Sequence, residues 1–498
     1  MNRTPNIYWG DIHNHCNISY GHGRLEDALA RAGQQLDFCS VTGHAFWHDM
    51  PEGKSGLAEA VRQHTRGFEK LAKNWDKVTR KIAGFNKDNS FLAFQSYEWH
   101  SAGFGDYCIY YPGDYAPLVT ADHPASLGKK INDTGGIMVP HHTAYKKGYR
   151  GLDWDSFDEK RSPLVEVFSM HGCSESDLSP YPYLHVMGPR DYKGTAEYGL
   201  ERGYRFGFTA SSDHHDAYPG SWGDGRTAIY ADSLTRASAW KSMLARKTYA
   251  VTGDKIRVFF HLNGGLPGDR LDGAGKREIN ISLETEDFLD RVELVKNAKV
   301  IRFFTDNGKC TRAGRGKVKI RLEWGWGFKD TGTKWRGKAK IENGSIISAE
   351  PCFRGRPVLA PGRGQAPDKP LPHEIHSLDK TSCIWSSFTF RNPTNLHPST
   401  QSVVLKLDTA KNSRLRIETN GIKEEIPISS LLRGSVSLYA GEHISNAVLV
   451  HRAVPESRYL FDIQMIDDGP EREIDYYYLR VSQKNGQWAW VTPVWIAS

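Results

Sequence analysis

His13-Asn14-His15 directly follows the run Ile7–Ile12, which has the pattern of a β-strand. Three later runs repeat this arrangement of a strand that ends in metal-ligand residues: Val41-Thr42-Gly43-His44, Val139-Pro140-His141-His142 and Asp213-His214-His215. Residues i and i+2 of a strand point the same way, so each His-x-His or Asp-x-His pair is directed at one point. Ligands at the carboxyl ends of several parallel strands are how an α/β barrel builds an active site. The pattern therefore predicts a multinuclear metal centre.

Strand and helix signals alternate over residues 1–275, which predicts a parallel α/β fold. The repeated ligands at strand ends favour a barrel within that class. Helices are expected over 25–36, 56–82 and 235–247. Strands are expected over 7–12, 38–42, 91–97, 136–139, 164–169, 204–210 and 248–251.

The pattern changes over residues 276–498, where short strand signals are separated by Gly, Pro and Asn and long helical signals are scarce. This texture predicts an all-β, sandwich-like accessory domain. The Pro- and Gly-rich stretch 357–372 is expected to be a long exposed loop within it. Strands are expected over 278–283, 292–295, 318–323, 403–407 and 476–481.

Composition sets limits on the class of protein. At about 150 residues per domain, 498 residues with 39% hydrophobic content predict two to four folded domains. The net charge of +7, from 65 basic and 58 acidic residues, gives no reason to expect a nucleic-acid partner. Seven cysteines without a CxxC pair are expected to be reduced thiols. We find no apolar signal region and no long apolar run, so we expect no membrane contact and a cytoplasmic location. The sequence leaves the oligomeric state open.

The ligand candidates outnumber what one tetrahedral metal ion needs. Imidazole suits Zn, Fe or Mn, and carboxylates can bridge two ions, so we expect two or three divalent ions. Of the adjacent His141 and His142, only one should face the metals, and we assign His141; His214 should point away. The expected metal ligands are His13, His15, His44, Glu98, His141, Asp213 and His215, with His22 in the Gly21-His22-Gly23 loop able to reach back to them.

The order of these motifs resembles the polymerase-and-histidinol-phosphatase (PHP) superfamily. The resemblance covers about the first 275 residues and is carried by Trp9–His15, Val41–His44, Glu98, His141 and Ser211–His215. Three stretches resemble a branch with a trailing β-domain: Pro163–Val167 leading to His171-Gly172, Thr248–Gly253, and the tail Tyr477–Val481 with Ala489-Trp490 and Pro493-Val494-Trp495. The resemblance implies a distorted (β/α)7 barrel with a trinuclear site and, commonly, metal-dependent phosphoesterase activity. It also implies that the seven residues named above are ligands.

Two positions depart from the family pattern. Gly43 stands where the motif before the second-strand histidine usually has Asp, which removes a carboxylate near the metals. After Glu98 the family often places a further His, and here Asp106 is the nearest match, with His100 as the alternative. The third ion is the one that these departures affect.

Residues near the ligands could recognise a substrate. Lys146, Lys147, Arg150 and Arg226 follow ligand runs and are either a phosphate clamp or a solvated surface. Trp9, Tyr20, Trp47, Trp99 and Trp222 are either barrel packing or a stacking wall for a sugar or aromatic group. We assign proton transfer to His171 and His142, with an orienting role as the alternative for His171.

Three functions remain in competition. The first is a metal-dependent phosphoesterase, in which a metal-bridging hydroxide attacks the phosphoester of a small molecule. The second keeps the metals but cleaves a glycosidic or other sugar-linked bond of a saccharide. The third is a non-catalytic PHP-like domain with a partner-binding β-domain. No glycine-rich phosphate loop is present, so ATP or NAD use is not expected.

Overall fold

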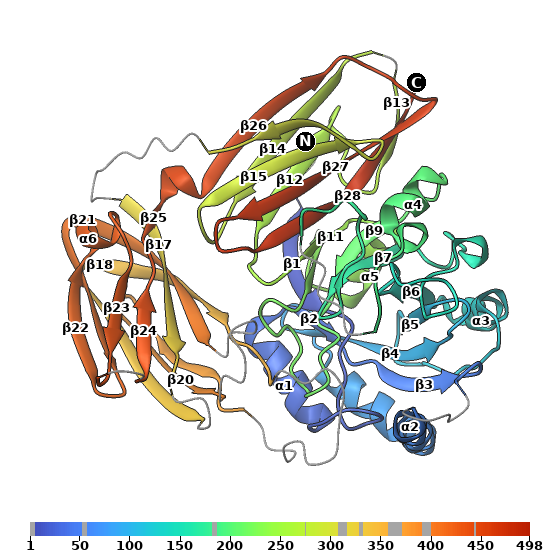
Figure 1. The fold of residues 1–498 in the computed structure, drawn as a ribbon, viewed down its shortest axis with the longest axis horizontal. Coiled ribbons are helices and arrows are strands. Elements are labelled where there is room, and N and C mark those ends of the chain that lie inside the picture. Colours follow the sequence, from blue (N-terminus) through green and yellow to red (C-terminus); the bar gives the residue numbers. More distant parts are fainter. Residues whose placement is uncertain are drawn as a thin grey trace.

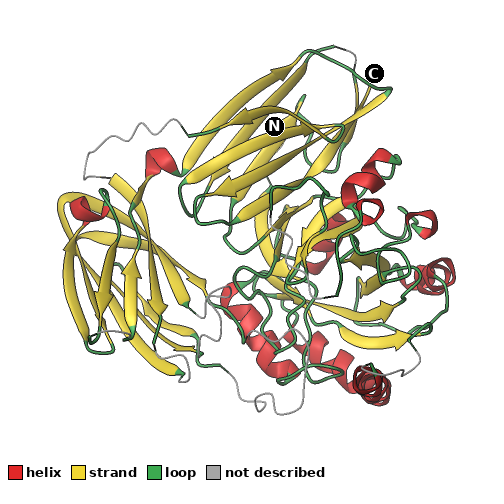
Figure 2. Ribbon diagram, viewed as in Figure 1, coloured by secondary structure: helices red, strands yellow, loops and turns green. Residues whose placement is uncertain are grey.

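The computed structural model describes residues 5–51, 57–181, 187–273, 275–306, 316–327, 332–356, 371–390, 400–442 and 445–498. These form three lobes, one with helices around a sheet and two built from strands (Figure 1). Figure 2 shows that the helices gather on the first lobe. A mixed α/β portion followed by a β-rich region is therefore the observed fold class. Residues 357–370 of the expected loop lie outside the described residues.

The first lobe contains a curved run of strands in the order β6-β5-β4-β2-β1-β10-β11, with β3 beside β4. A second small sheet, β8-β7-β9, lies against it, with β7 next to β6 and β9 next to β11. The strands are β1 (Asn6–Asp11), β2 (Phe38–Ser40), β3 (Gly43–Trp47), β4 (Leu92–His100), β5 (Asp106–Tyr111), β6 (Ile137–His141), β7 (Leu164–Ser169), β8 (Gly172–Cys173), β9 (Gly207–Ala210), β10 (Arg226–Ala231) and β11 (Thr248–Val251).

The strand directions differ from the parallel fold that the alternation predicted. β1, β2 and β4 are parallel, as are β7 and β9, but β5 runs antiparallel to both β4 and β6. β10 likewise runs antiparallel to β1 and β11. The cause is clear for β5: only residues 101–105 join it to β4, and a parallel crossover needs about a dozen or more residues.

Helices cover the outside of the first lobe. In α2, Leu71, Trp75, Val78 and Ile82 are buried at helical spacing, so one face of the helix packs on the sheet. No helix in the described ranges is long and apolar enough to cross a membrane. The helices are α1 (Leu25–Gln35), α2 (Ala58–Phe85), α3 (Pro124–Ile131), α4 (Ala196–Glu201) and α5 (Arg236–Leu244), with short 3-10 turns η1 (Asn132–Thr134), η2 (Trp154–Ser156) and η3 (Tyr192–Gly194).

The second lobe, which we call the sandwich, continues the sheet of the first. β28 pairs with β11, and β27, β15 and β16 follow it, while β12-β14-β26 forms the facing layer around a shared apolar core. The strands are β12 (Arg257–Leu262), β13 (Arg270–Asp272), β14 (Arg277–Glu284), β15 (Leu289–Lys296), β16 (Lys299–Phe304), β26 (Leu460–Asp467), β27 (Ile474–Gln483) and β28 (Trp488–Ala497).

The third lobe, which we call the inserted lobe, lies in sequence between β16 and β26 and has its own apolar core. The β-rich region that the sequence pattern treats as one unit thus contains two cores, and β12 joins it from before residue 276. The elements are β17 (Gly316–Gly325), β18 (Thr333–Cys352), β19 (Glu374–Leu378), β20 (Ser382–Thr389), β21 (Gln401–Thr419), β22 (Ile422–Pro427), α6 (Ile428–Leu431), β23 (Val436–Tyr439), β24 (Ala447–Val450), β25 (Val454–Pro455) and η4 (Glu456–Arg458).

Candidate metal centre

The segments that follow β1 and β9 lie against each other. Asn14 and His214 form a parallel bridge, His15 N donates to His214 O at 2.8 Å, and Asp213 N donates to His13 O at 2.8 Å. This arrangement leaves His15 Nε2 2.9 Å and His13 Nε2 3.3 Å from Asp213 Oδ1. The two pairs predicted from alternation therefore meet at one carboxylate.

Asp11, which the sequence reasoning missed, holds the two segments in this arrangement. It is fully buried, and its Oδ2 accepts from Ser212 Oγ at 2.5 Å and from Gly220 N at 2.6 Å. Its Oδ1 accepts from His13 N at 3.1 Å and Ser212 N at 3.2 Å. The signal was present in the sequence, because Asp11 precedes His13 by two residues and so shares its face of the strand.

Ring nitrogens in the centre face acceptors instead of donors. His15 Nδ1 donates to Thr42 O at 2.5 Å and His215 Nδ1 donates to Asp213 O at 2.8 Å, since a carbonyl can only accept. In the neutral tautomer each Nε2 then carries a lone pair. The Nε2 of His15 nevertheless lies 2.9 Å from Asp213 Oδ1 and 3.2 Å from His13 Nε2. Such contacts are favourable only with a proton or a metal cation between them.

Glu98 links the two sides of the centre. Pairing of β3 with β4 sets it opposite His44, whose Nδ1 lies 2.7 Å from Glu98 Oε2. The other carboxylate oxygen, Oε1, lies 3.0 Å from His141 Nε2. In the part of the chain that the structure describes, neither His141 nitrogen nor Glu98 Oε2 makes an aligned hydrogen bond. This is the geometry of a carboxylate able to bridge two ions.

Burial and charge keep the centre in a ligating state. Burial raises the pKa of Glu98, but His100, His44 and His141 outweigh it and hold that pKa well below its usual range. Burial lowers the pKa of His44 and of His141 well below the usual value for histidine. The neighbouring histidines thus favour the ionised form of the carboxylate, and burial favours the neutral form of these two rings, which are the forms that metal ligation requires.

His141 and His142 both border the centre, contrary to the expectation that only one would. His142 has a left-handed backbone with φ +33°, so strand alternation ends at His141. Its Nε2 lies 3.3 Å from Asp106 Oδ2, and β5–β6 pairing sets Asp106 opposite His141. His214 does point away, and its ring lies near Tyr218.

Asp106 and His100, the two residues considered for the position after Glu98, both lie in the candidate centre. His100 Nδ1 lies 3.2 Å from Asp106 Oδ2 and 3.3 Å from Glu98 Oε1. His44 Nδ1 lies 3.0 Å from His100 Nε2. The alternatives are thus neighbours, since β4 and β5 form a hairpin that returns Asp106 to His100.

His171 and His22 have different placements. His171 Nε2 lies 3.0 Å from Asp213 Oδ2, and its ring lies 5.4 Å from that of His142. His22 donates from its backbone N to His215 O at 2.8 Å, but among the described residues its ring belongs to none of the donor groups. The structure therefore brings His171 into the centre and places His22 beside it.

Two further side chains escaped the sequence reasoning. Glu166 on β7 faces His13 Nδ1 at 3.1 Å, and burial raises its pKa to about 7. Cys108 forms a donor group with His13 and His141. Glu166 could have been found as a single charge within the apolar run Leu164–Ser169. A carboxylate on the far nitrogen of a ligating histidine orients the ring.

Close packing explains why position 43 is a glycine. A Cβ at this position would lie 2.8 Å from Leu71 Cδ1 of α2 and 3.3 Å from Ile18 Cδ1. The aspartate that the family motif carries would be forced against apolar groups here. The described residues supply other carboxylates and contain five groups of side chains that could each hold a metal ion: His13–Cys108–His141, His15–His44–His215, His13–His15–Asp213, His44–Glu98–His100 and Asp106–His141–His142.

A partly exposed rim surrounds the centre. Tyr20 stacks on His64 with ring centroids 4.5 Å apart, and the Trp47 ring lies 5.6 Å from that of His64. His64, on α2, was not anticipated. The Arg150 guanidinium lies 5.0 Å from the Trp47 ring centroid.

The other substrate-facing candidates are accounted for elsewhere. Arg226 is fully buried and donates to Gly220 O, and Lys147 pairs with Asp153 at 2.7 Å. Lys146 is exposed, with its Nζ 6.0 Å from the ring centroid of the exposed Tyr149, so it belongs to the solvated surface. The rings of Trp9, Trp99 and Trp222 are buried and so act in packing.

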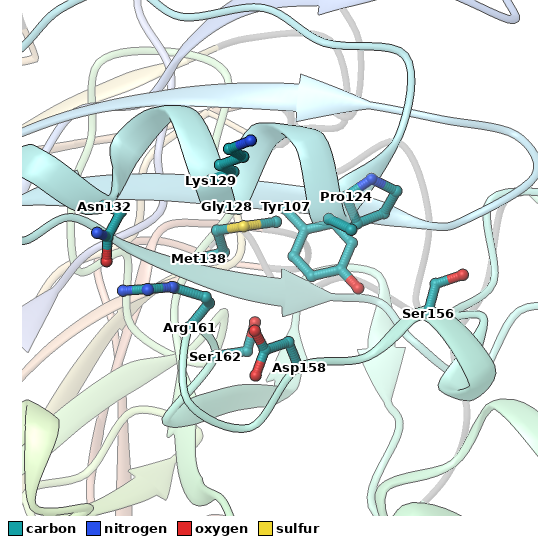
Figure 3. Close-up of a pocket in the computed structure, with 11 residues that line it drawn as sticks. Tyr107, Pro124, Gly128, Lys129, Asn132, Met138, Ser156, Asp158, Arg161 and Ser162 are labelled. Carbon is teal, nitrogen blue, oxygen red and sulfur yellow. The ribbon is translucent and has the colours of Figure 1, made fainter.

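The hollow drawn in Figure 3 is separate from the centre. It has a volume of about 260 Å³ and lies between α3, Tyr107 and Met138. Tyr107 follows Asp106 on β5, so the two side chains point to opposite faces of the strand. None of the ligand candidates lines this hollow.

The inserted lobe contacts the ligand-bearing loop that follows β9. Arg356 Nη1 lies 3.1 Å from both Asp216 oxygens, directly after His215. Gly355 N donates to Ser221 Oγ at 3.1 Å, and Trp222 N donates to Phe353 O at 2.9 Å. The loop that carries two ligand candidates is thus held from outside the first lobe.

Comparison with known proteins gives distant likenesses. No family model matches the chain. It is 24% identical over 337 residues to an uncharacterized protein of Chlamydia pneumoniae, covering 61% of this chain and 50% of that protein. A similar protein of Chlamydia muridarum is 22% identical over 332 residues, with the same coverage of 61% and 50%. The chain spans about half the length of these relatives.

One solved structure is also similar. It is a two-domain protein containing a predicted PHP-like metal-dependent phosphoesterase from Bacteroides vulgatus, 13% identical, with a TM-score of 0.32. The match covers 58% of this chain and 79% of that one.

Proposed function

We propose that this chain is a metal-dependent hydrolase of the PHP type, with a distorted barrel, that cleaves phosphoesters of a small molecule. The observation that carries the proposal is the set of buried ring nitrogens whose lone pairs face carboxylates. His15 and His215 have Nδ1 fixed as a donor to a carbonyl, which in the neutral tautomer leaves the Nε2 lone pair available for ligation. Orienting bonds on the far nitrogen are the usual mark of metal-binding histidines.

The residues fit two or three divalent ions. His13, His15 and Asp213 form one donor group, with Glu98 Oε2 3.5 Å from His15 Nε2, and His44, Glu98 and His100 form a second. His15, His44 and His215 form another donor group. Mn, Zn or Fe suits this mixture of imidazole and carboxylate. Bound ions would lower the pKa of a water toward 7 and neutralise charge on a phosphoryl group.

The other side chains would position the ligands and move protons. Glu166 holds the ring of His13, and Asp11 locks the loop that carries Asp213. His171 and His142 stand at the edge of the centre, each next to a carboxylate, where either ring could donate a proton to a leaving group.

Metal analysis joined to activity tests the proposal. Elemental analysis of the purified protein should give at least two equivalents of Mn, Zn or Fe. Hydrolysis of p-nitrophenyl phosphate or its diester should be lost on chelation and restored by metal. Asp213→Asn should lower both metal content and activity, while Asp462→Asn, a change on β26 in the sandwich, should alter neither. Protein that takes up no metal and shows no metal-dependent hydrolysis would contradict the proposal.

A second candidate is cleavage of a sugar-linked bond in a saccharide at the same centre. The partly exposed Tyr20 and Trp47 favour it, because such rings can stack on a sugar face. Comparing phosphorylated with unphosphorylated oligosaccharides as substrates separates the two.

Six cysteines of the described residues are buried and free, which supports a reducing compartment such as the cytoplasm.

A further inference from the structure

Arg150 is held in an uncommon backbone conformation beside the centre. Its φ is +69°, in the left-handed region that non-glycine residues rarely adopt. Its N donates to Ala102 O at 3.1 Å, and Leu152 N donates to Thr143 O at 3.0 Å. These bonds fix a tight loop after β6 that turns the Arg150 side chain toward the ligands. Strained residues of this kind gather at functional sites.

The guanidinium is anchored on two sides. Its Nε donates to Asp106 Oδ2 at 2.7 Å, and its Nη2 donates to the same oxygen and lies 3.1 Å from His100 Nδ1. The Trp47 ring covers one face with its centroid 5.0 Å away. Asp106 also accepts from Ser101 N at 3.0 Å, so this carboxylate is already well satisfied.

The third nitrogen, Nη1, faces outward. Within the described ranges, Nη1 donates to Met187 Sδ at 3.2 Å, and a thioether is a weak acceptor. Met187 is 37% exposed and the Arg150 side chain 19%, so this edge leads from the centre toward solvent. A stronger acceptor that entered from solvent would replace the sulfur.

We propose that Arg150 anchors the substrate by donating from Nη1 to an anionic phosphoryl oxygen, while Asp106 holds the guanidinium in place. This inference rests on the proposed phosphoesterase function and adds a binding residue to it. His100 bridges the two parts of the site, lying beside Nη2 and 3.3 Å from Glu98 Oε1. A phosphoryl group that accepts from Nη1 would lie on the solvent side of His100, at the entrance to the centre. Planar Arg donors suit phosphate oxygens better than a lysine does.

The same contacts limit the Asp106–His141–His142 donor group. A cation there would lie next to the guanidinium and compete with it for Asp106. This group should therefore hold no ion in the unmodified protein, with Arg150 supplying the positive charge.

Calorimetric titration with inorganic phosphate tests the proposal. The metal-loaded protein is compared with Arg150→Gln, Arg150→Lys and Lys146→Gln, which removes a charge from the same loop. Arg150→Gln should weaken phosphate binding about 10- to 100-fold, Arg150→Lys by a smaller factor, and Lys146→Gln by less than about twofold. Metal content by elemental analysis should be the same in the wild type and in Arg150→Lys and Lys146→Gln.

The outcomes distinguish this inference from the function beneath it. Metal-loaded Arg150→Gln that binds phosphate as tightly as the wild type would overturn the role of Arg150 and leave the metal centre intact. If Arg150→Gln does not fold, unchanged affinity in Arg150→Lys has the same consequence. A wild type that takes up no metal contradicts the proposed function itself, and the anchoring role of Arg150 falls with it.

Discussion

Two buried aspartates show the difference between the candidate metal centre and a structural joint, by which we mean the buried contact of side chains from all three lobes around Asp254. Asp254 accepts from Arg321 Nη2 at 2.7 and 2.9 Å, and from Trp222, Gln483 and Asn485. All of these are fixed donors, and they come from all three lobes. Asp213 instead faces the ring nitrogens of His13, His15 and His171, of which His15 is oriented as an acceptor by the bond from its Nδ1 to Thr42 O. A buried carboxylate with fixed donors needs nothing more, whereas one that faces lone pairs needs a proton or a metal cation between them.

The largest effect on metal affinity is expected when a carboxylate of the candidate metal centre is replaced. Glu98→Gln replaces the carboxylate shared by His44 and His141 with a neutral amide. Loss of a bridging ligand should weaken metal affinity more than about 1000-fold, beyond the 10- to 100-fold that orienting residues cost. Competition titration with a metal indicator measures it, with Glu424→Gln, a change at an exposed position on β22, as control. Metal content equal to that of the wild type would mean that Glu98 is not a ligand.

The opposite result is expected at the joint. Asp254→Ala leaves Arg321 buried without its partner, which should lower the free energy of unfolding by about 3–5 kcal/mol. Urea unfolding measures the loss. Below the denaturant transition the metal content should match that of the wild type. A variant that lost metal while still folded would show that the joint and the centre are coupled.

Glu286 extends the comparison to pH. It lies beside the joint with its side chain 13% exposed and 2.9 Å from Lys319, and burial raises its pKa to about 7 from 4.5. Between those values the folded protein binds a proton that the unfolded chain has released, so the contribution of Glu286 to stability falls as pH rises from 4.5 to 7. Glu286→Gln should remove a loss on the order of 3 kcal/mol. Unfolding of both proteins at pH 5 and pH 8 measures it; an equal pH dependence would contradict the assignment.

Much of the centre could be predicted from sequence, because most of its ligand candidates are neighbours in the sequence at the ends of strands. His13 and His15, or Asp213 and His215, need only strand alternation and two adjacent strand ends. The same rule failed for His142, where a left-handed residue ends the alternation. Asp11 and Glu166 were missed because one reads as part of a motif and the other as an interruption of a strand.

The arrangement of lobes could not be predicted in the same way. Trp490 of β28 pairs with Ala250 of β11, across the whole of the two β-lobes. Nothing in the local pattern of either strand specifies that partner, since alternation gives the face of a strand and not its neighbour. The chain leaves the sandwich after β16, forms the inserted lobe, and comes back to the sandwich at β26.

The smallest expected effect concerns how the inserted lobe supports the centre. Arg356→Ala removes the bond to Asp216, next to His215, but leaves the hydrogen bonds from Gly355 N to Ser221 Oγ and from Trp222 N to Phe353 O. Because these still hold the loop, metal affinity should fall only about threefold, below the 10- to 100-fold of an orienting residue. Arg354→Ala is the matched control, since Arg354 covers the Trp222 ring at 4.4 Å without pairing to Asp216. If both variants bind metal as the wild type does, the first lobe positions Asp213 and His215 alone, through Asp11 and the His13–Asp213 backbone bond.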